Sequence, residues 1–258
     1  MNRIENAFKN KPIFMPYFPL GYPDLDTSID VIEALAKNGA DLIEVGLSFS
    51  DPLADGPVIQ HATQVALEQG ITVKKSLEAV RKLRQRGVDI PLVLMGYYNP
   101  MLAYGLEKFV RDAAEAGADG FIVPDLPMEE SEEFVGAMHA SPLPLIQMLA
   151  PTTPPDRMEK IARNAQGFIY LVSVTGITGE RKSLAEGLGE LIRRVREHAS
   201  VPVCVGFGIS TPEQAKEVGK MADGVIVGTA CVRTIGWSES SIEAARDFAR
   251  RFREAFIK

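Results

Sequence analysis

The chain has 258 residues, of which 46% are hydrophobic and 24% charged, and these are values of a folded globular protein. A chain of this length buries roughly 73% of its unfolded surface, so its stability requires neither a disulfide nor a structural metal. The balance of 28 basic against 34 acidic residues excludes the broad basic surface of a general nucleic-acid binder.

Cys204 and Cys231 stand in apolar surroundings, which predicts two buried free thiols. Two cysteines make neither a disulfide framework nor a metal cluster, and this usage fits a reducing compartment. The sequence shows no signal peptide and no apolar run long enough for a membrane helix. We therefore expect a cytoplasmic protein.

Short apolar runs alternate with helical periodicity along the chain. We predict strands at residues 13–18, 41–46, 91–96, 120–124, 144–149, 168–172, 201–206 and 223–228. These runs are continuously apolar, which is typical of parallel strands buried on both faces. We predict helices at 26–38, 72–86, 104–116, 129–139, 155–163, 184–198, 211–219 and 239–256, with extra helices at 57–69 and 2–9.

Eight strand–helix pairs predict an α/β fold, a (β/α)8 TIM barrel with extra short helices. An open, doubly wound sheet is the alternative. No Gly-x-Gly-x-x-Gly opens the first helix, so a dinucleotide-binding fold is less favoured. No linker rich in Pro, Ser or Gly divides the chain, and we predict a single TIM-barrel domain over residues 1–258.

One pattern recurs in the segments 34–46, 113–124 and 218–228. Each segment has a helical stretch, a corner of small residues that contains Ala-Asp, and a short apolar run. In the first two copies Gly39 and Gly117 stand at the corner, where a helix end requires a positive φ. A helix followed promptly by a buried strand is half of a βαβ unit, so the repeat supports a parallel sheet.

Glu44 interrupts the apolar pattern of the predicted strand 41–46. Alternation places Glu44 on one face with Leu42 and Gly46, whereas residues 43 and 45 face the helix layer. We expect its carboxylate at the mouth of the barrel, where active sites of this fold lie, with open space left above it by Gly46. Burial there raises its pKa and suits it to acid–base chemistry. A structural carboxylate paired with a cation inside the barrel is the alternative.

The loop after this strand adds two more carboxylates, Asp51 and Asp55. Acidic residues beside Gly and Pro are also ordinary in turns, and Asp55 is placed to cap a helix at 57–69. Glu44 and Asp55 nevertheless stand near one strand end. They are therefore a candidate acid–base pair.

The ends of the last two predicted strands suggest a phosphate site. Residues 206–213 carry two glycines, then Ser210 and Glu213 at capping-box spacing, which predicts a helix N-terminus with free N–H groups. Residues 227–230 form another small, open turn. Loops after strands seven and eight are the recurrent phosphate site of TIM barrels, and tight turns without a ligand are the alternative.

Other segments near strand ends carry weaker signals. Residues 173–183 are small, polar and charged, which indicates either a mobile lid or a plain solvated loop. Residues 97–99 include two tyrosines, whose aromatic rings can either line a substrate pocket or pack in the core. His61, His139 and His198 fall on predicted helices without ligand spacing, so we expect no metal site.

Together these residues resemble the signature of the tryptophan synthase α chain family. The longest match is EVGLSFSDPLADGPVIQ at 44–60. The shorter matches, in family order, are YFPLGYP at 17–23, MGYYN at 95–99, VPDLPMEE at 123–130, APTTP at 150–154, YLVSVTGITG at 170–179 and GFGIS at 206–210. They span nearly the whole chain, and the combination is specific although no single piece is.

The resemblance implies a lyase that reversibly cleaves indole-3-glycerol phosphate to indole and D-glyceraldehyde 3-phosphate by a retro-aldol reaction. The family's catalytic Glu matches Glu44, which exchanges protons with indole C3 and the glycerol hydroxyl. The family's catalytic Asp matches Asp55, which holds the indole N–H. Family positions in the indole pocket and lid match Tyr17, Tyr97, Ile122, Tyr170 and Thr178, and phosphate-binding positions match Gly179, Phe207, Gly208, Gly228 and Thr229.

The resemblance also implies a partner. Family members form an αββα complex with a β chain that holds pyridoxal phosphate and uses the indole to make L-tryptophan. Asp51 matches the face that signals to that partner, and no cofactor is implied for this chain. A stand-alone indole-3-glycerol phosphate lyase and a catalytically weak regulatory subunit are the alternatives. Another phosphosugar barrel enzyme explains the phosphate turns but not residues 44–60.

The chain departs from the family pattern at a few positions. Pro19 stands where Thr is usual, Leu47 where Ile or Val is usual, and Ser48 where Pro is usual. Ser48 removes a φ restraint from the loop that carries Asp51 and Asp55. We predict a more mobile loop and weaker coupling to a β chain.

Overall fold

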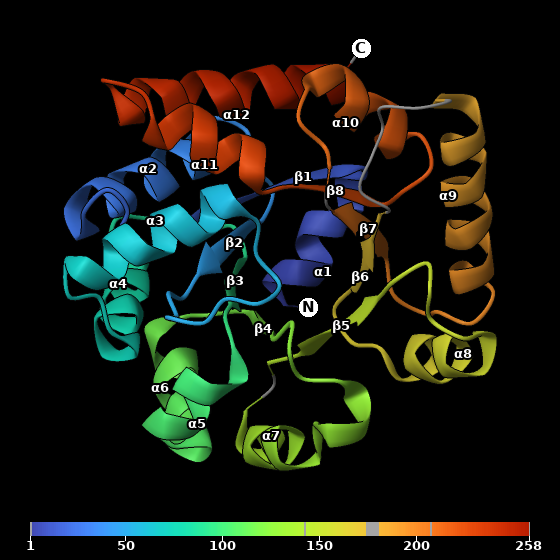
Figure 1. The fold of residues 1–258 in the computed structure, drawn as a ribbon, viewed down its shortest axis with the longest axis horizontal. Helices are drawn as coiled ribbons and strands as arrows, with labels where there is room; N and C mark the ends of the chain where they lie inside the picture. The colour runs from blue at the N-terminus through green and yellow to red at the C-terminus, as the bar shows by residue number, and fades with distance from the viewer. Residues whose placement is uncertain (1, 142, 174–180, 207, 258) are drawn as a thin grey trace.

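The computed structural model describes residues 2–141, 143–173, 181–206 and 208–257. Eight parallel strands close into a barrel in chain order, β1 to β8, with helices around it (Figure 1). The strands are β1 Ile13–Pro19, β2 Ile43–Gly46, β3 Leu92–Met95, β4 Gly120–Ile122, β5 Leu145–Leu149, β6 Ile169–Val172, β7 Val203–Gly206 and β8 Gly224–Val227. All eight predicted strands and the TIM-barrel fold are confirmed.

The helices follow the strands as the βα alternation requires. The α-helices are α1 Arg3–Ala7, α2 Leu25–Lys37, α3 Pro57–Glu68, α4 Val73–Gln85, α5 Tyr98–Tyr104, α6 Leu106–Ala116, α7 Glu132–Ala137, α8 Pro155–Asn164, α9 Arg181–Arg196, α10 Pro212–Gly219, α11 Thr229–Gly236 and α12 Ser241–Ile257. Three 3-10 turns are η1 Phe8–Asn10, η2 Met128–Glu130 and η3 Met138–Ala140. Within the described part of the chain, no helix has the length and apolar character needed to cross a membrane.

The helix predictions fail at four places. The helix expected at 104–116 is α6, which begins at Leu106, whereas α5 before it was not expected; Gly105, with φ +92°, separates the two. The helix expected at 129–139 is the short α7 flanked by η2 and η3. Helix α11 was not expected. Helix α9 begins at Arg181, so the predicted lid overlaps its first turn.

Alternating strand residues separate two apolar layers. Ile43 and Val45 of β2 face the helices, whereas Leu42 packs inside the barrel. This is the alternation that the sequence predicts for β2. Ile4 and Phe8 join the interior cluster from α1 and η1, and the Phe8 ring lies 6.0 Å from that of Phe168. The N-terminal segment thus closes one end of the barrel.

The Ala-Asp corner of the repeated segments forms the same clasp in all three copies. The aspartate donates its N–H to a carbonyl on a neighbouring strand and accepts, on its carboxylate, the N–H of that same residue. The pairs are Asp41 with Phe14, Asp119 with Leu92 and Asp223 with Val203, with carboxylate distances of 2.8, 2.8 and 3.0 Å. The repeat therefore fixes strand register at the N-terminal end of the barrel.

Each clasp also holds an arginine from the helix layer. Arg253 of α12 lies 2.7 Å from Asp41, Arg84 of α4 lies 2.5 Å from Asp119, and Arg196 of α9 lies 2.9 Å from Asp223. Strand β6 pairs with β5 in a register that places Gln147 opposite Ile169. In this register Gly167, with φ +66°, takes the place before the strand that the aspartate takes in the three clasps. Glycine supplies no carboxylate, so β5 and β6 lack this clasp.

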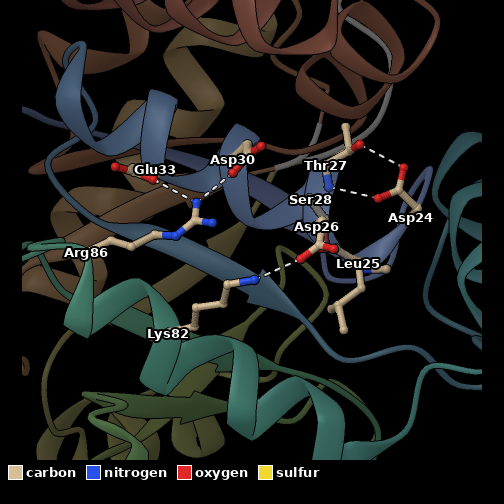
Figure 2. A network of polar contacts seen from close by, with 10 residues as sticks. Asp24, Leu25, Asp26, Thr27, Ser28, Asp30, Glu33, Lys82 and Arg86 are labelled. Carbon is tan, nitrogen blue, oxygen red and sulfur yellow. Dashed lines mark hydrogen bonds and ion pairs between the residues drawn. The ribbon is translucent and has the colours of Figure 1, made fainter.

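Ion pairs also connect neighbouring helices. Figure 2 shows α2 and α4 side by side, with Lys82 2.8 Å from Asp26 and Arg86 2.6 Å from Asp30. Helix α2 is capped by Asp24, whose carboxylate accepts the N–H of the third helical residue. These contacts lie on the outer layer and set the spacing of helices rather than the chemistry of the barrel mouth.

Candidate active site

Glu44 is the buried carboxylate inside the barrel. Its side chain is 1% exposed, and its Oε1 finds no hydrogen-bond partner among the described residues. Burial raises the pKa of this carboxyl to about 8. No described cation pairs with Glu44, so the alternative of a structural ion pair has no support in the described part of the chain. A neutral carboxyl with an unused oxygen is suited to proton transfer.

Two tyrosines occupy space that glycines provide. Tyr17 of β1 pairs in register with Glu44, and a Cβ on Gly46 would lie 2.3 Å from the Tyr17 Oη. Tyr170 of β6 lies in the same way against Gly206, where a Cβ would be 2.3 Å from its Oη. The expectation of open space above Glu44 was wrong, because the Tyr17 ring fills the position that Gly46 vacates.

The tyrosines place both carboxylates in one region. Burial raises the pKa of Tyr17 well above its usual range, and the charges of Asp55 and Glu44 raise it further. The same three causes act on the pKa of Tyr170, with Glu44 the stronger of the two carboxylates. Glu44 and Asp55 therefore lie within electrostatic reach of the same two tyrosines.

Asp55 lies half-buried in the loop between β2 and α3, and Tyr97 holds it there. The Tyr97 hydroxyl donates a hydrogen bond to Asp55 Oδ2 at 3.0 Å and accepts the N–H of Ala54 at 2.9 Å. Burial raises the pKa of Asp55, and the hydrogen bond from Tyr97 opposes this rise. Asp55 does not cap α3, because the N-cap is Gly56 and no side chain bonds there.

The first turn of α10 is satisfied by its own chain. Its N-cap is Thr211, whose side chain accepts the N–H of Gln214, and Gln214 Oε1 accepts the N–H groups of Ser210 and Thr211. The predicted capping box of Ser210 and Glu213 was therefore one residue out of place. The N–H groups at this corner already have acceptors, which leaves fewer for an anion.

Helix α11 offers the free N-terminus instead. Its N-cap is Gly228, no side chain caps it, and its first turn contains no acidic residue. Thr229 is the first helical residue and is exposed. Gly208, with φ +76° after β7, has no atom within 4 Å of the position of an added Cβ. An extra short helix after strand eight is the anion site of many TIM barrels.

Helix α11 has a signal in the sequence, the spacing of its apolar residues. Apolar Ala230, Cys231, Val232 and Ile235 lie on its buried side, in helical spacing directly after Gly228. The apolar run of β8 ends one residue earlier, at Val227, so the two patterns merge in the sequence. The buried positions of Cys204 and Cys231 themselves were predicted, and both thiols are free.

The remaining predicted site residues divide into three groups. Ile122 is fully buried inside the barrel, in the interior cluster that also contains Ile146 and Tyr170. Asp51 lies exposed in the loop after β2, where it accepts a hydrogen bond from Ser50. Thr178, Gly179 and Phe207 lie outside the described residues.

A closed parallel barrel, with a buried carboxylate inside it and a helix N-terminus without a side-chain cap after β8, defines a protein of the (β/α)8-barrel class. The sequence model of the family described as "Tryptophan synthase alpha chain" matches residues 4–256. The chain belongs to the tryptophan synthase alpha chain family. The alpha chain of this family is a lyase that cleaves indole-3-glycerol phosphate, and it needs no cofactor itself because pyridoxal phosphate belongs to the beta chain.

Individual relatives agree with this assignment. The tryptophan synthase alpha chain of Roseiflexus sp. (strain RS-1) is 47% identical over 98% of this chain and 100% of its own. That of Chloroflexus aggregans is 48% identical over 90% of this chain and 89% of its own. The crystal structure of the tryptophan synthase subunit alpha from Legionella pneumophila has a TM-score of 0.90 at 34% identity, covering 100% of this chain and 99% of that one.

Proposed function

We propose that Glu44 is the acid–base group of the indole-3-glycerol phosphate cleavage in this chain. The observation that carries this assignment is the buried, unpartnered Oε1 of Glu44, combined with a pKa of about 8. At neutral pH a carboxyl with this pKa is mostly protonated. Its Oε1 has no hydrogen-bond partner among the described residues. It is therefore available as a general acid.

The proton moves in a closed cycle. Glu44 donates its proton to indole C3, which leaves positive charge on the ring system centred at the N–H. The Glu44 carboxylate then takes the proton of the glycerol hydroxyl on the carbon attached to C3. The carbon–carbon bond breaks, its electron pair returns to the ring, and the hydroxyl carbon becomes the aldehyde of glyceraldehyde 3-phosphate. Indole retains the first proton, and Glu44 ends protonated.

Asp55 is assigned to the indole N–H. Tyr97 donates to its Oδ2, so Oδ1 remains for a ligand, since no described side chain donates to it. A carboxylate at this point stabilises the positive charge that develops on the ring after C3 is protonated. Tyr17, Ile122 and Tyr170 are assigned to the walls around the indole.

The phosphate is assigned to the N-terminus of α11. Gly228 and Thr229 provide N–H groups without intrahelical acceptors, and Gly208 leaves the backbone of the preceding loop accessible. These groups can hold a phosphate without a basic side chain, which agrees with the acidic composition of the chain. The assignments of Thr178, Gly179 and Phe207 rest on the resemblance alone.

We assign the β chain to the side of the barrel that carries the loop after β2. Asp51 is exposed on this loop, and Leu53 beside it is 90% exposed. Leu102 on α5, which follows the neighbouring strand β3, is also exposed. Apolar side chains in water beside a charged group are typical of a protein interface, and an αββα complex is the assembly we expect.

We further propose that residues 1–258 act as one domain in the cytoplasm. The closed barrel uses strands from both ends of the sequence, since β1 pairs with β8. Both cysteines are buried free thiols, which fits a reducing compartment.

The direct test is release of indole from indole-3-glycerol phosphate by the purified chain, alone and with a tryptophan synthase β chain. We expect slow release by the chain alone and faster release in the complex. Full activity without a β chain would instead identify a stand-alone lyase. No release under either condition, with substrate still bound, would support a regulatory subunit and refute the assignment of Glu44.

A further inference from the structure

Tyr97 contacts the loop after β2 at three points. Its ring lies 5.6 Å from that of Phe49, and its hydroxyl contacts both Ala54 and Asp55. Tyr97 itself is 5% exposed and precedes α5 as its N-cap residue. A rigid group that follows β3 therefore holds the segment that carries Asp55.

The hydrogen bonds fix the direction of the Tyr97 proton. The Ala54 N–H can only donate, so the Tyr97 oxygen accepts from it and must direct its own proton elsewhere. The Tyr97 O–H therefore donates a hydrogen bond to Asp55 Oδ2, at 3.0 Å. One hydroxyl thus orders the backbone at Ala54 and the neighbouring carboxylate together.

We propose that Tyr97 is a positioning residue for Asp55, whose hydroxyl orients the carboxylate toward the indole N–H and favours its ionised form. This inference rests on the proposed function. It assigns to Tyr97 a polar task in addition to the place in the indole pocket that the resemblance implies. The proposed role depends on the Tyr97 hydroxyl and not on its ring.

The charges around Tyr97 support its role as the hydrogen-bond donor to Asp55. Burial and the Asp55 carboxylate raise the pKa of Tyr97, and Asp125 adds to this rise, so Tyr97 remains a donor throughout the working pH range. Glu44 is more buried than Asp55, and the charges of both carboxylates act on Tyr17 and Tyr170. Among the described side chains, Tyr97 is the one that donates to the Asp55 carboxylate, whereas Gln60 donates to the Asp55 backbone carbonyl.

The test is Tyr97→Phe, which keeps the ring against Phe49 and removes the hydroxyl. We expect kcat/KM for indole release to fall about 10-fold and the acidic limb of its pH profile to move up by about one pH unit, because Asp55 loses a donor that favours its charged form. The matched control is Tyr104→Phe, because Tyr104 at the end of α5 donates to a different carboxylate, that of Asp112, at 2.8 Å. This control should leave the profile unchanged.

A second comparison separates positioning from general loosening of the loop. In an Asp55→Asn background, Tyr97→Phe should lower the remaining activity less than 2-fold, since the group through which it acts is already gone. An unshifted acidic limb in Tyr97→Phe, or a full 10-fold further loss in the Asp55→Asn background, would overturn the proposal. Absence of indole release in the unmodified chain and in Tyr104→Phe would instead contradict the proposed function.

Discussion

Gly206 and Gly46 hold no side chain because tyrosine hydroxyls occupy the space that a Cβ would need. For Gly206→Ala, the added Cβ would lie 2.3 Å from the Tyr170 Oη. We predict a loss of about 1–3 kcal/mol in the free energy of unfolding, together with lower activity, because the Tyr170 ring must shift. Urea denaturation measures the first effect.

Gly187→Ala in α9 is the matched control, since an added Cβ there meets nothing within 4 Å. A helix interior gains about 0.5–1 kcal/mol from this exchange. Equal stability changes in the two variants would show that the Tyr170 ring does not depend on Gly206.

The protonation of Glu44 sets a further expectation at the residue scale. Burial raises its pKa to about 8, and cleavage begins with its protonated form. We predict that kcat/KM for indole release falls about tenfold for each pH unit above that value. A pH series of initial rates from about 6 to 10 measures this, and a rate that stays flat or rises throughout would rule out the acid role.

At the scale of elements, the clasp at Asp119 links β4, β3 and α4. Its carboxylate accepts the Leu92 N–H at 2.8 Å and pairs with Arg84 at 2.5 Å. We predict that Asp119→Ala lowers the free energy of unfolding by about 2–4 kcal/mol, because the Leu92 N–H loses its acceptor and the largely buried Arg84 guanidinium loses its counter-charge. Glu243→Gln on the exposed face of α12 should leave the denaturation midpoint unchanged. Midpoints that shift equally would mean that the clasp adds nothing.

The elements also show what the sequence can predict. The Ala-Asp repeat and the apolar runs predicted all eight strands, because burial on both faces leaves a continuous local signal. Glu44 stood out because a carboxylate costs free energy inside such a strand. Helix α11 was missed since its apolar side continues the pattern of β8 without a break. The cap of α10 was misplaced because Ser210, Thr211 and Glu213 all carry capping residue types, and only tertiary geometry selects Thr211.

At the scale of the whole molecule, the two ends of the barrel divide stability from chemistry. Three Asp clasps and α1 lie at the N-terminal end, whereas Glu44, Asp55 and the α11 N-terminus lie at or after the carboxyl ends of the strands. This division is general in TIM barrels. It allows the loops at the mouth to vary without loss of strand register.

Ser48 bears on the coupling between this barrel and a β chain. Its Oγ is buried without a described partner, and the loop beyond it is held at Ala54 and Asp55 by Tyr97. We predict that Ser48→Pro restricts the loop and increases the activation of indole release by a β chain a few-fold. The measurement is the ratio of rates with and without the β chain, and an equal ratio in both proteins would refute the prediction.

Glu44 carries the proposed chemistry, and Glu44→Gln tests its role directly. Glutamine retains the size of the side chain but carries no acidic proton. We predict that kcat for indole release from indole-3-glycerol phosphate, measured in the complex with a β chain, falls about 10²–10⁴-fold while KM changes little. A variant that releases indole at the rate of the unmodified chain would contradict the assignment of Glu44 as the acid–base group.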